Sequence, residues 1–484
     1  MAGVFGDGQL YIDGRWVPGG GGMEDSVNPA TGETVGRMAQ GGAREATAAV
    51  DAAARAFPLW AAEPAPARAA ILRRAAALLQ ERCEAIAALM TAEQGKPLAE
   101  ARGEVGLTAD YFLWNAEEAR RICGQTIPAS SAGKRLFALR QPVGVSAAIT
   151  PWNFPAAMIG RKIAPALAAG CPVVCKPAPA TPLVACAVFA CLHDAGLPPG
   201  VANLVAGPAE AIGEVFLSDP RVRKISFTGS ARVGKHLARR AADGLKRISL
   251  ELGGHAPFLV FADADLERAA DGVLASKMRN AGQTCICADR LYVEASVFEP
   301  FLEAVAARVR ALRVGPGTEA GTDIGPMIGA AAVGRASALV REAVAGGARV
   351  LCGGEALPGP GHFFAPTLLR DVPEGSALAA AETFAPVLPA WPFAREAEAV
   401  RRANDTPYGL AAYVYTRDLS RAIRVAEALE YGIIGLNDPV PTVAQAPFGG
   451  VKESGLGREG GSEGIAGYLE TKFISLGLEV APQI

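Results

Sequence analysis

Two series of short apolar, β-branched runs alternate with helical segments, and this alternation limits the possible folds more than any other sequence feature. Each series predicts a parallel, doubly wound sheet, because strands separated by helices pair in parallel. The 484 residues also exceed the roughly 250–300 residues at which a single core stops growing, so two α/β domains are expected. The predicted strands are Val143–Thr150, Pro172–Lys176, Val201–Val205, Lys224–Phe227 and Arg247–Leu250 in the first series, and Phe258–Phe261, Leu291–Val293, Arg349–Leu351, Val387–Phe393 and Ala412–Tyr415 in the second.

Three segments lie outside these two series. An alanine-rich segment from Ala43 to Arg121 has helical periodicity, with Leu72 and Leu79 on its apolar face. The strand-like segments Arg135–Arg140 and Tyr468–Leu476 are isolated in the sequence. Their isolation predicts an arm that pairs with a distant part of the chain or with another subunit.

Composition excludes several classes of protein. Apolar residues make up 50% of the chain, charged residues 20%, and the net charge is -2, so large cores can form without a basic excess that would attract nucleic acid. Nine cysteines without paired metal-ligand spacing argue against a disulfide framework or a zinc ribbon and indicate a reducing compartment. The four histidines are dispersed, so no metal site is expected.

Neither an export signal nor a membrane span is expected. Residues Met1–Trp16 lack the basic start and apolar run of a secretory peptide. The longest uncharged stretch, Gln141–Gly160, contains three prolines and an asparagine, which would leave backbone groups unsatisfied in a bilayer. We therefore expect a cytoplasmic protein with no membrane or nucleic-acid partner.

Cys285 is the first candidate for chemistry. It lies in the glycine-containing segment Asn280–Cys287, and a loop gives a thiol access that a core position denies. A buried, inert cysteine is the common alternative, and this interpretation is expected to hold for Cys171, Cys186 and Cys191 in their apolar surroundings.

Glu251 ends a predicted strand between two leucines and precedes the pair Gly253–Gly254, which lets another group approach closely. A desolvated carboxylate has a raised pKa and can act as a base near neutral pH. A salt-bridged glutamate at a strand end is the better interpretation of Glu251 in isolation. His255 follows this glycine pair and invites pairing with Cys285, but a solvated loop histidine is the favoured interpretation.

Asn153 follows a predicted strand and precedes a helix, which is the edge of an open α/β sheet where ligands bind. Its amide could donate a hydrogen bond to a developing oxyanion, and a turn residue or helix cap is the alternative. The segment Phe227–Gly234 also runs from a strand into a helix, where glycines let a pyrophosphate approach the helix amides. By itself, this second pattern is weak.

Taken together, seven stretches resemble the aldehyde dehydrogenase superfamily in their order and spacing, over nearly the whole chain. They are Pro151–Pro155, Lys176–Pro177, Phe227–Ser230, Glu251–Gly254, Gly282–Cys285, Glu382–Phe384 and Pro447–Gly450. The resemblance implies an aldehyde dehydrogenase-like α/β fold of two doubly wound domains and a small β oligomerisation arm. The expected boundaries are 1–122 and 143–253 for the NAD(P)-binding domain, 254–455 for the catalytic domain, and 123–142 with 456–484 for the arm and C-terminal strand.

The family's catalytic roles transfer to three positions. Cys285 matches the nucleophile that forms a thiohemiacetal, and its oxyanion would be held by Asn153 and the Cys285 backbone N–H. Glu251 matches the base that activates water to hydrolyse the resulting thioester. The resemblance therefore implies release of a free acid and not transfer to coenzyme A.

The cofactor implied by the resemblance is NADP or NAD. Pro179 stands where NAD-preferring members usually carry a glutamate, and Lys176 is a possible partner for a 2′-phosphate, so we expect NADP to be accepted. Ala385 replaces the glycine of the usual E-x-F-G-P pattern, which affects only local backbone geometry. The expected cofactor residues are Thr150, Pro151, Trp152, Lys176, Pro179, Gly229, Ser230, Leu252, Glu382 and Phe384.

The substrate positions resemble those of succinate-semialdehyde dehydrogenases. Arg161 and Arg279 occupy aldehyde-tunnel positions that are large and apolar in enzymes for simple aldehydes, and two guanidinium groups can bind a carboxylate. A salt bridge at the surface or between domains is the alternative role for either arginine. The expected substrate residues are Phe154, Arg161, Arg279, Thr442 and Phe448.

Several alternatives stay open at this point. Asn115, where relatives often have an aromatic residue, could favour glutarate or 2-oxoglutarate semialdehyde, and a broad range of aliphatic or aromatic aldehydes is a further alternative. Other classes are a cofactor-independent thiol esterase and a non-catalytic structural protein. The resemblance also implies a homodimer or homotetramer, built through Arg135–Arg140 and Lys472–Leu476, and a reversible Cys285–Cys287 disulfide known in some relatives.

Overall fold

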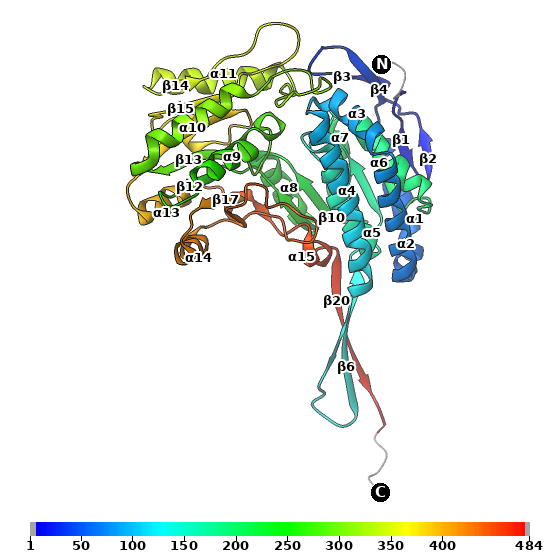
Figure 1. Ribbon diagram of the computed structural model, residues 1–484. Helices are drawn as coiled ribbons and strands as arrows, with labels where there is room; N and C mark the ends of the chain where they lie inside the picture. The colour runs from blue at the N-terminus through cyan, green and yellow to red at the C-terminus, as the bar shows by residue number, and fades with distance from the viewer. Residues whose placement is uncertain (1–5, 480–484) are drawn as a thin grey trace.

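The computed structural model describes residues 6–479, which form two α/β bodies and a protruding arm. Figure 1 shows the first body on the right, the second on the left, and the arm extending below them. The first body is built on an eight-stranded sheet and the second on a seven-stranded sheet, counted over the described residues. Two doubly wound units were predicted, and the aldehyde dehydrogenase-like α/β architecture is confirmed.

The sheet of the first body has the strand order β19-β11-β10-β7-β8-β9-β1-β2. Its five central strands, β11 to β9 in this order, are parallel, whereas β19, β1 and β2 join the edges in antiparallel fashion. The strands are β1 (Leu10–Ile12), β2 (Arg15–Val17), β7 (Val145–Ile149), β8 (Val173–Lys176), β9 (Ala202–Leu204), β10 (Val222–Thr228), β11 (Arg247–Glu251) and β19 (Gly455–Leu456). A separate hairpin pairs β3 (Met23–Val27) with β4 (Thr34–Ala39).

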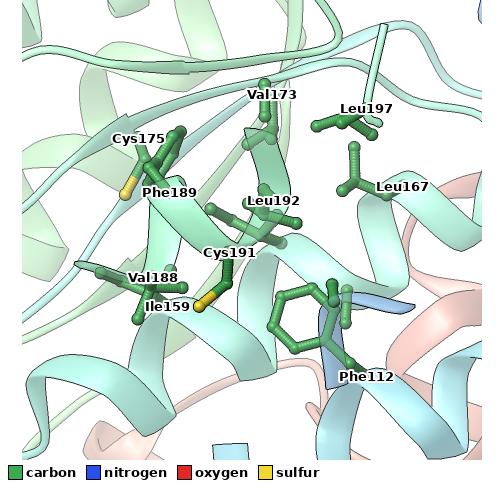
Figure 2. Close-up of a cluster of buried hydrophobic side chains, with 14 of the residues drawn as sticks. Phe112, Ile159, Leu167, Val173, Cys175, Val188, Phe189, Cys191, Leu192 and Leu197 are labelled. Carbon is green, nitrogen blue, oxygen red and sulfur yellow. The ribbon is translucent and has the colours of Figure 1, made fainter. Parts of the chain in front are cut away.

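Helices cover both faces of this sheet, and the predicted helical segment before the first strand series is confirmed. The helices are α1 (Ala43–Ala62), α2 (Ala65–Glu81), α3 (Cys83–Gln94), α4 (Leu98–Glu118), α5 (Pro155–Ala169), α6 (Pro182–Asp194), α7 (Ala209–Ser218) and α8 (Ala231–Asp243), with a 3-10 turn η1 (Ala119–Arg121) after α4. All residues of α5 are buried, which places this helix at the centre of the largest core. Figure 2 shows part of this core, where Phe112 of α4 and Ile159 of α5 pack with Leu192 of α6.

The sheet of the second body has the order β14-β15-β16-β13-β12-β17-β18, and all neighbours are parallel except β14 and β15. Its strands are β12 (Ala256–Val260), β13 (Ala288–Glu294), β14 (Arg349–Cys352), β15 (Thr367–Arg370), β16 (Val387–Phe393), β17 (Ala411–Tyr415) and β18 (Ile433–Leu436). Its helices are α9 (Leu266–Lys277), α10 (Phe298–Ala311), α11 (Ala330–Ala345), α12 (Ala377–Ala380), α13 (Glu396–Asn404) and α14 (Leu419–Ala428), with the 3-10 turns η2 (Arg279–Gly282) and η3 (Ala295–Val297).

The isolated strand segments form the arm. Strand β6 (Lys134–Pro142) pairs with β20 (Leu469–Gly477) in antiparallel register, with Arg140 opposite Thr471. Strand β5 (Gln125–Ile127) lies on the other side of β6. The prediction that these segments pair with a distant part of the chain is therefore confirmed. The last elements before the arm are η4 (Lys452–Ser454) and α15 (Gly461–Ala466).

Every predicted strand falls on an observed strand, but the analysis of apolar runs missed several short ones. The missed strands include β1 to β4, β15 and β18, which have three to six residues each. The apolar stretch Gln141–Gly160 is divided between β6, β7 and α5. No helix in the described residues is both long and apolar enough to cross a membrane.

Candidate active site

A cavity of about 310 Å³ lies between the two bodies, beyond the carboxyl ends of β7, β10 and β11. The first body contributes Asn153, from the loop between β7 and α5, and Glu251, the last residue of β11. The second body contributes Cys285, which follows η2. Ligands of open α/β sheets bind at this edge, as the sequence predicted for Asn153.

The cavity brings together most of the predicted site residues. Those that line it are Pro151, Trp152, Asn153, Phe154, Gly229, Ser230, Glu251, Leu252, Cys285, Glu382 and Phe384. The other predicted residues, which lie outside this lining, are Thr150, Lys176, Pro179, Arg161, Arg279, Thr442 and Phe448. Contacts described below connect most of this second group to the cavity.

Cys285 is a partly exposed residue, but burial of its thiol raises the pKa of that group to about 12. The nearby carboxylates of Glu382 and Glu251 contribute to this raised pKa, and Arg161 opposes it. The thiolate is the nucleophilic form of cysteine. Attack by Cys285 therefore requires a base or a nearby positive charge during the reaction.

Glu251 is 2% exposed, and neither of its carboxylate oxygens has a hydrogen-bond partner in residues 6–479. Burial raises the pKa of Glu251 well above its ordinary value, the neighbouring Glu459 raises it further, and Lys162 and Arg161 oppose this rise. The alternative of a salt-bridged glutamate is wrong, since no cation forms an ion pair with Glu251 in the described chain. A carboxylate in this state is suited to general-base chemistry.

Behind Glu251 lies a buried ion pair that the sequence analysis missed. Lys162 of α5 donates a hydrogen bond to the Glu459 carboxylate, and Ser226 Oγ donates to the same carboxylate over 3.1 Å. Burial alone would raise the pKa of Glu459, but Lys162 and Arg161 hold it below its usual range. The two residues are 297 positions apart in the sequence, and no local pattern connects them.

Asn153 is held by its side-chain amide. Its Nδ2 donates to the carbonyl of Gln283 over 2.9 Å, which leaves its second amide hydrogen for another acceptor. The alternative role of Asn153 as a helix cap is wrong, because Glu104 Oε1 accepts the N–H groups of Ala156 and Ala157 at the start of α5. The amide of Asn153 is therefore available to a ligand in the cavity.

The prediction that the glycine pair after Glu251 allows a close approach is confirmed. A Cβ atom on Gly253 would lie 2.6 Å from Oε2 of Glu382. A Cβ atom on Gly254 would lie 2.3 Å from the carbonyl oxygen of Cys285. Any larger residue here would displace the nucleophile loop or Glu382, so the pair permits the two bodies to meet at the cavity.

One half of the cavity has the features of a dinucleotide site. The rings of Trp152 and Phe384 meet edge to face, with centroids 5.6 Å apart. Ser230 is the N-cap of α8, and its Oγ accepts the N–H of Val233. Burial raises the pKa of Glu382 to about 8, and its Oε1 accepts the N–H of Gly254.

Lys176 fits a 2′-phosphate beside this half. The side chain is 4% exposed, and its Nζ donates only to the carbonyl of Pro177 and forms no ion pair in the chain from 6 to 479. Burial lowers the pKa of Lys176. The N–H of Thr150 donates to the carbonyl of Lys176, whereas Pro179 is exposed, so no carboxylate stands at this position to repel a phosphate.

Two of the predicted substrate residues are arginines that pack on aromatic rings of the other predicted positions, Phe448 and Phe154. Arg161 is 3% exposed; its Nε donates to the hydroxyl of Tyr111 over 2.9 Å, and its guanidinium lies 3.9 Å from the Phe448 ring centroid. The guanidinium of Arg279 lies 5.1 Å from the centroid of Phe154, which lines the cavity. The salt-bridge alternative is wrong for both arginines, because neither has a carboxylate partner among the described residues. Thr442 Oγ1 is buried, and the described chain offers it no hydrogen-bond partner.

Two residues that were not predicted also line the cavity, and one prediction near it is wrong. Arg335 and Ala332 of α11 line the cavity, and Arg335 donates to the carbonyl of Glu382; their surface-like helical pattern gave no signal. The prediction that His255 is solvated is wrong, since it is fully buried and, among the described residues, its Nε2 donates to the carbonyl of Leu378. Burial lowers the pKa of His255 to about 3, so it is uncharged.

The other cysteines agree only partly with prediction. Cys171 and Cys191 are buried as expected, but Cys186 is partly exposed, because its thiol lies at the edge of the core, between Met38 and the carbonyl of Gln9. Cys287 is buried and its thiol contacts the carbonyl of Gly282 over 3.3 Å. Ala385 has no positive φ, so its replacement of glycine is accommodated without strain.

The fold and the cavity define a thiol-dependent oxidoreductase with a dinucleotide site. Residues 16–474 match the Aldehyde dehydrogenase family. The chain belongs to this family, and it is an NAD(P)-dependent aldehyde dehydrogenase. It is 51% identical over 471 residues to the succinate-semialdehyde dehydrogenase (NADP(+)) GabD of Escherichia coli (strain K12), covering 97% of this chain and 98% of the relative.

Two further comparisons agree with this assignment. The chain is 50% identical over 469 residues to the glutarate-semialdehyde dehydrogenase of Pseudomonas putida (strain KT2440), covering 97% of each chain. Its structure is similar to a crystal structure described as an E. coli NADP dependent enzyme, with a TM-score of 0.97, 50% identity and 99% of each chain covered. The predicted family and fold are therefore confirmed.

Proposed function

We propose that this protein oxidises an aldehyde that bears a carboxylate, preferably succinate semialdehyde to succinate, with NADP as its favoured cofactor. One observation carries the proposal: neither the buried Arg161, which lowers the pKa of the Cys285 thiol, nor Arg279, which packs on the cavity residue Phe154, forms an ion pair with a carboxylate in the described chain. An unpaired buried guanidinium is costly, and its planar fork binds a carboxylate through two hydrogen bonds. The names of relatives about half identical to this chain support the same substrate class.

In the proposed mechanism, Cys285 attacks the aldehyde carbon and forms a thiohemiacetal. The thiol proton leaves toward Glu251, whose raised pKa suits it to accept a proton near neutral pH. The free amide hydrogen of Asn153 and the backbone N–H of Cys285 donate to the developing oxyanion. The bound dinucleotide supplies the hydride acceptor for the oxidation.

Hydrolysis of the resulting thioester completes the proposed cycle. Glu251 first passes the thiol proton to solvent. It then removes a proton from water as the water attacks the thioester carbonyl, and Cys285 leaves as thiolate. Asn153 again stabilises the oxyanion. The carboxylate product is released, and the proton passes from Glu251 toward solvent.

The cofactor half would hold NADP through residues of the first body and the loop around Glu382. Lys176 would meet the 2′-phosphate, with Thr150 and Pro179 beside it, and the α8 N-terminus with Gly229, Ser230 and Leu252 would face the pyrophosphate. Pro151, Trp152, Glu382 and Phe384 would enclose the nicotinamide ribose. The presence of NADP in the printed name of the Escherichia coli relative supports this preference.

A matrix of kcat/KM values tests the proposal. Succinate, glutarate and 2-oxoglutarate semialdehydes and uncharged butyraldehyde are each assayed with NADP and with NAD. We expect succinate semialdehyde to exceed butyraldehyde by about 100-fold, since charged hydrogen bonds contribute roughly 1.5–3 kcal/mol each. Equal values for charged and uncharged aldehydes would remove the carboxylate role. Turnover without reduction of the cofactor would instead support a thiol esterase, and no turnover at all a structural protein.

Glutarate semialdehyde is the second candidate substrate. Asn115 of α4 is buried, its Nδ2 donates back to the Tyr111 carbonyl, and its Oδ1 has no partner among the residues described. Tyr111 in turn accepts a hydrogen bond from Arg161. A longer semialdehyde that reaches this polar atom would show the higher kcat/KM in the same matrix.

The domain division and assembly are also part of the proposal. Residues 1–122 and 143–253 would bind the cofactor, 254–455 would carry the nucleophile, and 123–142 with 456–484 would form the arm; residues 1–5 and 480–484 lie outside the described chain.

The arm exposes Leu139, Phe473 and Leu476, which a partner subunit in a homodimer or homotetramer would cover. A reducing cytoplasmic location agrees with nine unpaired cysteines, all in the described residues. Sedimentation of Phe473→Glu against the unaltered chain tests the assembly.

A further inference from the structure

The backbone just before the nucleophile has an unusual conformation. Asn280, Ala281 and Gly282 have φ values of 52°, 53° and 70°, so three consecutive residues are left-handed. Asparagine tolerates this region better than most residues, whereas alanine does not. Such a conformation persists only where the surroundings overdetermine it, and it is often found at functional sites.

The contacts that hold this turn come from the other body. Gln94, the last residue of α3, donates from its Nε2 to Oδ1 of Asn280 over 2.9 Å. Glu100 of α4 accepts the backbone N–H of Asn280, with its nearer oxygen at 2.9 Å. Both the side chain and the backbone of Asn280 are therefore fixed from outside its own loop.

Asn280 also contacts both parts of the proposed oxyanion site, which are the segment of Asn153 and the loop that carries Cys285. Its Nδ2 donates to the carbonyl of Asn153 over 3.0 Å and contacts the carbonyl of Gln283 over 3.3 Å. The amide of Asn153 donates to that same Gln283 carbonyl over 2.9 Å. Lys96 also donates to the Asn153 carbonyl, over 2.7 Å, while paired with Glu104. Asn153 and the loop that carries Cys285 are thus joined as one rigid unit.

We propose that Asn280 is a positioning residue, which sets the distance between the Asn153 amide and the Cys285 thiol without touching the substrate. This inference rests on the proposed roles of Cys285 and Asn153. The side chain of Asn280 is 1% exposed and makes every one of its contacts to protein, so it is not itself a ligand of the aldehyde. Its removal should impair the chemical step and leave substrate and cofactor binding nearly intact.

The main test compares Asn280→Gly with the unaltered chain. Glycine keeps the left-handed turn without strain and removes the amide contacts. We expect kcat for succinate semialdehyde to fall about 100-fold, because small misplacements of reacting groups have effects of this size. The KM for the aldehyde and the Kd for NADPH should change by about twofold or less. The matched control is Thr91→Val, which removes a buried hydroxyl without a hydrogen-bond partner in the described structure, on α3 beside Gln94.

Two readouts distinguish this role from a purely structural one. kcat is expressed per reactive Cys285, counted by mass after iodoacetamide labelling, so that loss of folded protein does not count as loss of catalysis. An unchanged kcat per reactive thiol, or a parallel rise in KM and Kd, overturns the inference. If the unaltered chain oxidises no aldehyde, the proposed function fails. The rate at which iodoacetamide labels Cys285, compared between Asn280→Gly and the unaltered chain, then tests the positioning role by itself. A change of about tenfold in Asn280→Gly supports positioning, and an equal rate refutes it.

Discussion

The buried charges of this protein include two groups that differ in how they are compensated. In the first group, lysines that hold the segments around the cavity are paired: Lys277 lies 2.6 Å from Asp289, and Lys96 lies 2.6 Å from Glu104, and all four side chains are almost fully buried. Around the thiol, by contrast, Glu251 and Arg161 have no ion-pair partner in the described chain. The paired charges hold structural elements together, whereas Glu251 and Arg161 can interact with a substrate, a water molecule or a proton.

The physical reason for this difference is the cost of desolvation. A buried ion without a counter-ion loses its hydration and recovers only part of that loss from neighbouring dipoles. Such a group persists where a ligand supplies the missing interaction or where a perturbed pKa serves chemistry. The contrast between the two groups therefore supports the proposed roles of Glu251 and Arg161, and the predictions below test it.

Glu251→Gln should have the largest effect. The amide cannot accept a proton, so hydrolysis of the thioester should slow and steady-state kcat should fall about 10³-fold. The first burst of reduced cofactor should slow as well, because Glu251 also accepts the thiol proton before the thioester forms. The matched control is Glu93→Gln, since Glu93 is a fully buried glutamate that already accepts three hydrogen bonds. Stopped-flow absorbance of the reduced cofactor measures both variants. If Glu251→Gln and Glu93→Gln lost equal kcat, Glu251 would have only a structural role.

Lys277→Met should act on stability. It leaves Asp289 buried without its cation, which lowers the free energy of unfolding by about 3 kcal/mol. A lower Tm in calorimetry checks this. The comparison variant is Lys235→Met, which breaks the half-exposed Lys235–Glu453 contact of 2.7 Å and should change stability by less than about 1 kcal/mol. Similar Tm changes in the two variants would contradict the distinction between buried and exposed pairs.

Arg279→Ala should separate charged from uncharged substrates. Loss of a charge-assisted hydrogen bond of about 2 kcal/mol corresponds to a rise of about 30-fold in KM for succinate semialdehyde. The KM for butyraldehyde should remain within about twofold, because it has no carboxylate. Initial rates with both aldehydes on the same preparation check this. A parallel rise would mean that Arg279 shapes the loop and does not recognise an anion.

The regular part of the fold could be predicted from the sequence. Buried parallel strands such as β8 are short continuous apolar runs, which stand out between helices. Strands β1 and β18 could not be found in this way, because they have only three or four residues and depend on neighbours far along the chain. Their pairing is a tertiary effect with no local signal.

The same limit applies to the site. Cys285, Glu251 and Asn153 lie in short motifs, so their sequence neighbours revealed them. Lys162 and Glu459 did not stand out, because they meet only in the folded chain. The prediction for His255 was wrong for a related reason. The preceding glycines are typical of a loop, but His255 lies directly before a fully buried strand.

The smallest expected effect concerns Lys176 and the choice of cofactor. Lys176→Met should lower kcat/KM for NADP by about tenfold and leave that for NAD nearly unchanged, since loss of one charge-assisted contact of about 1.4 kcal/mol corresponds to a tenfold change. Burial lowers the pKa of Lys176, so the charged form is lost as pH rises through a value below the usual lysine range. The ratio of kcat/KM for NADP over NAD should therefore fall with rising pH in the unaltered chain. In Lys176→Met the same ratio should not change with pH. An equal fall of the ratio in the variant would mean that another cation near the ribose binds the 2′-phosphate.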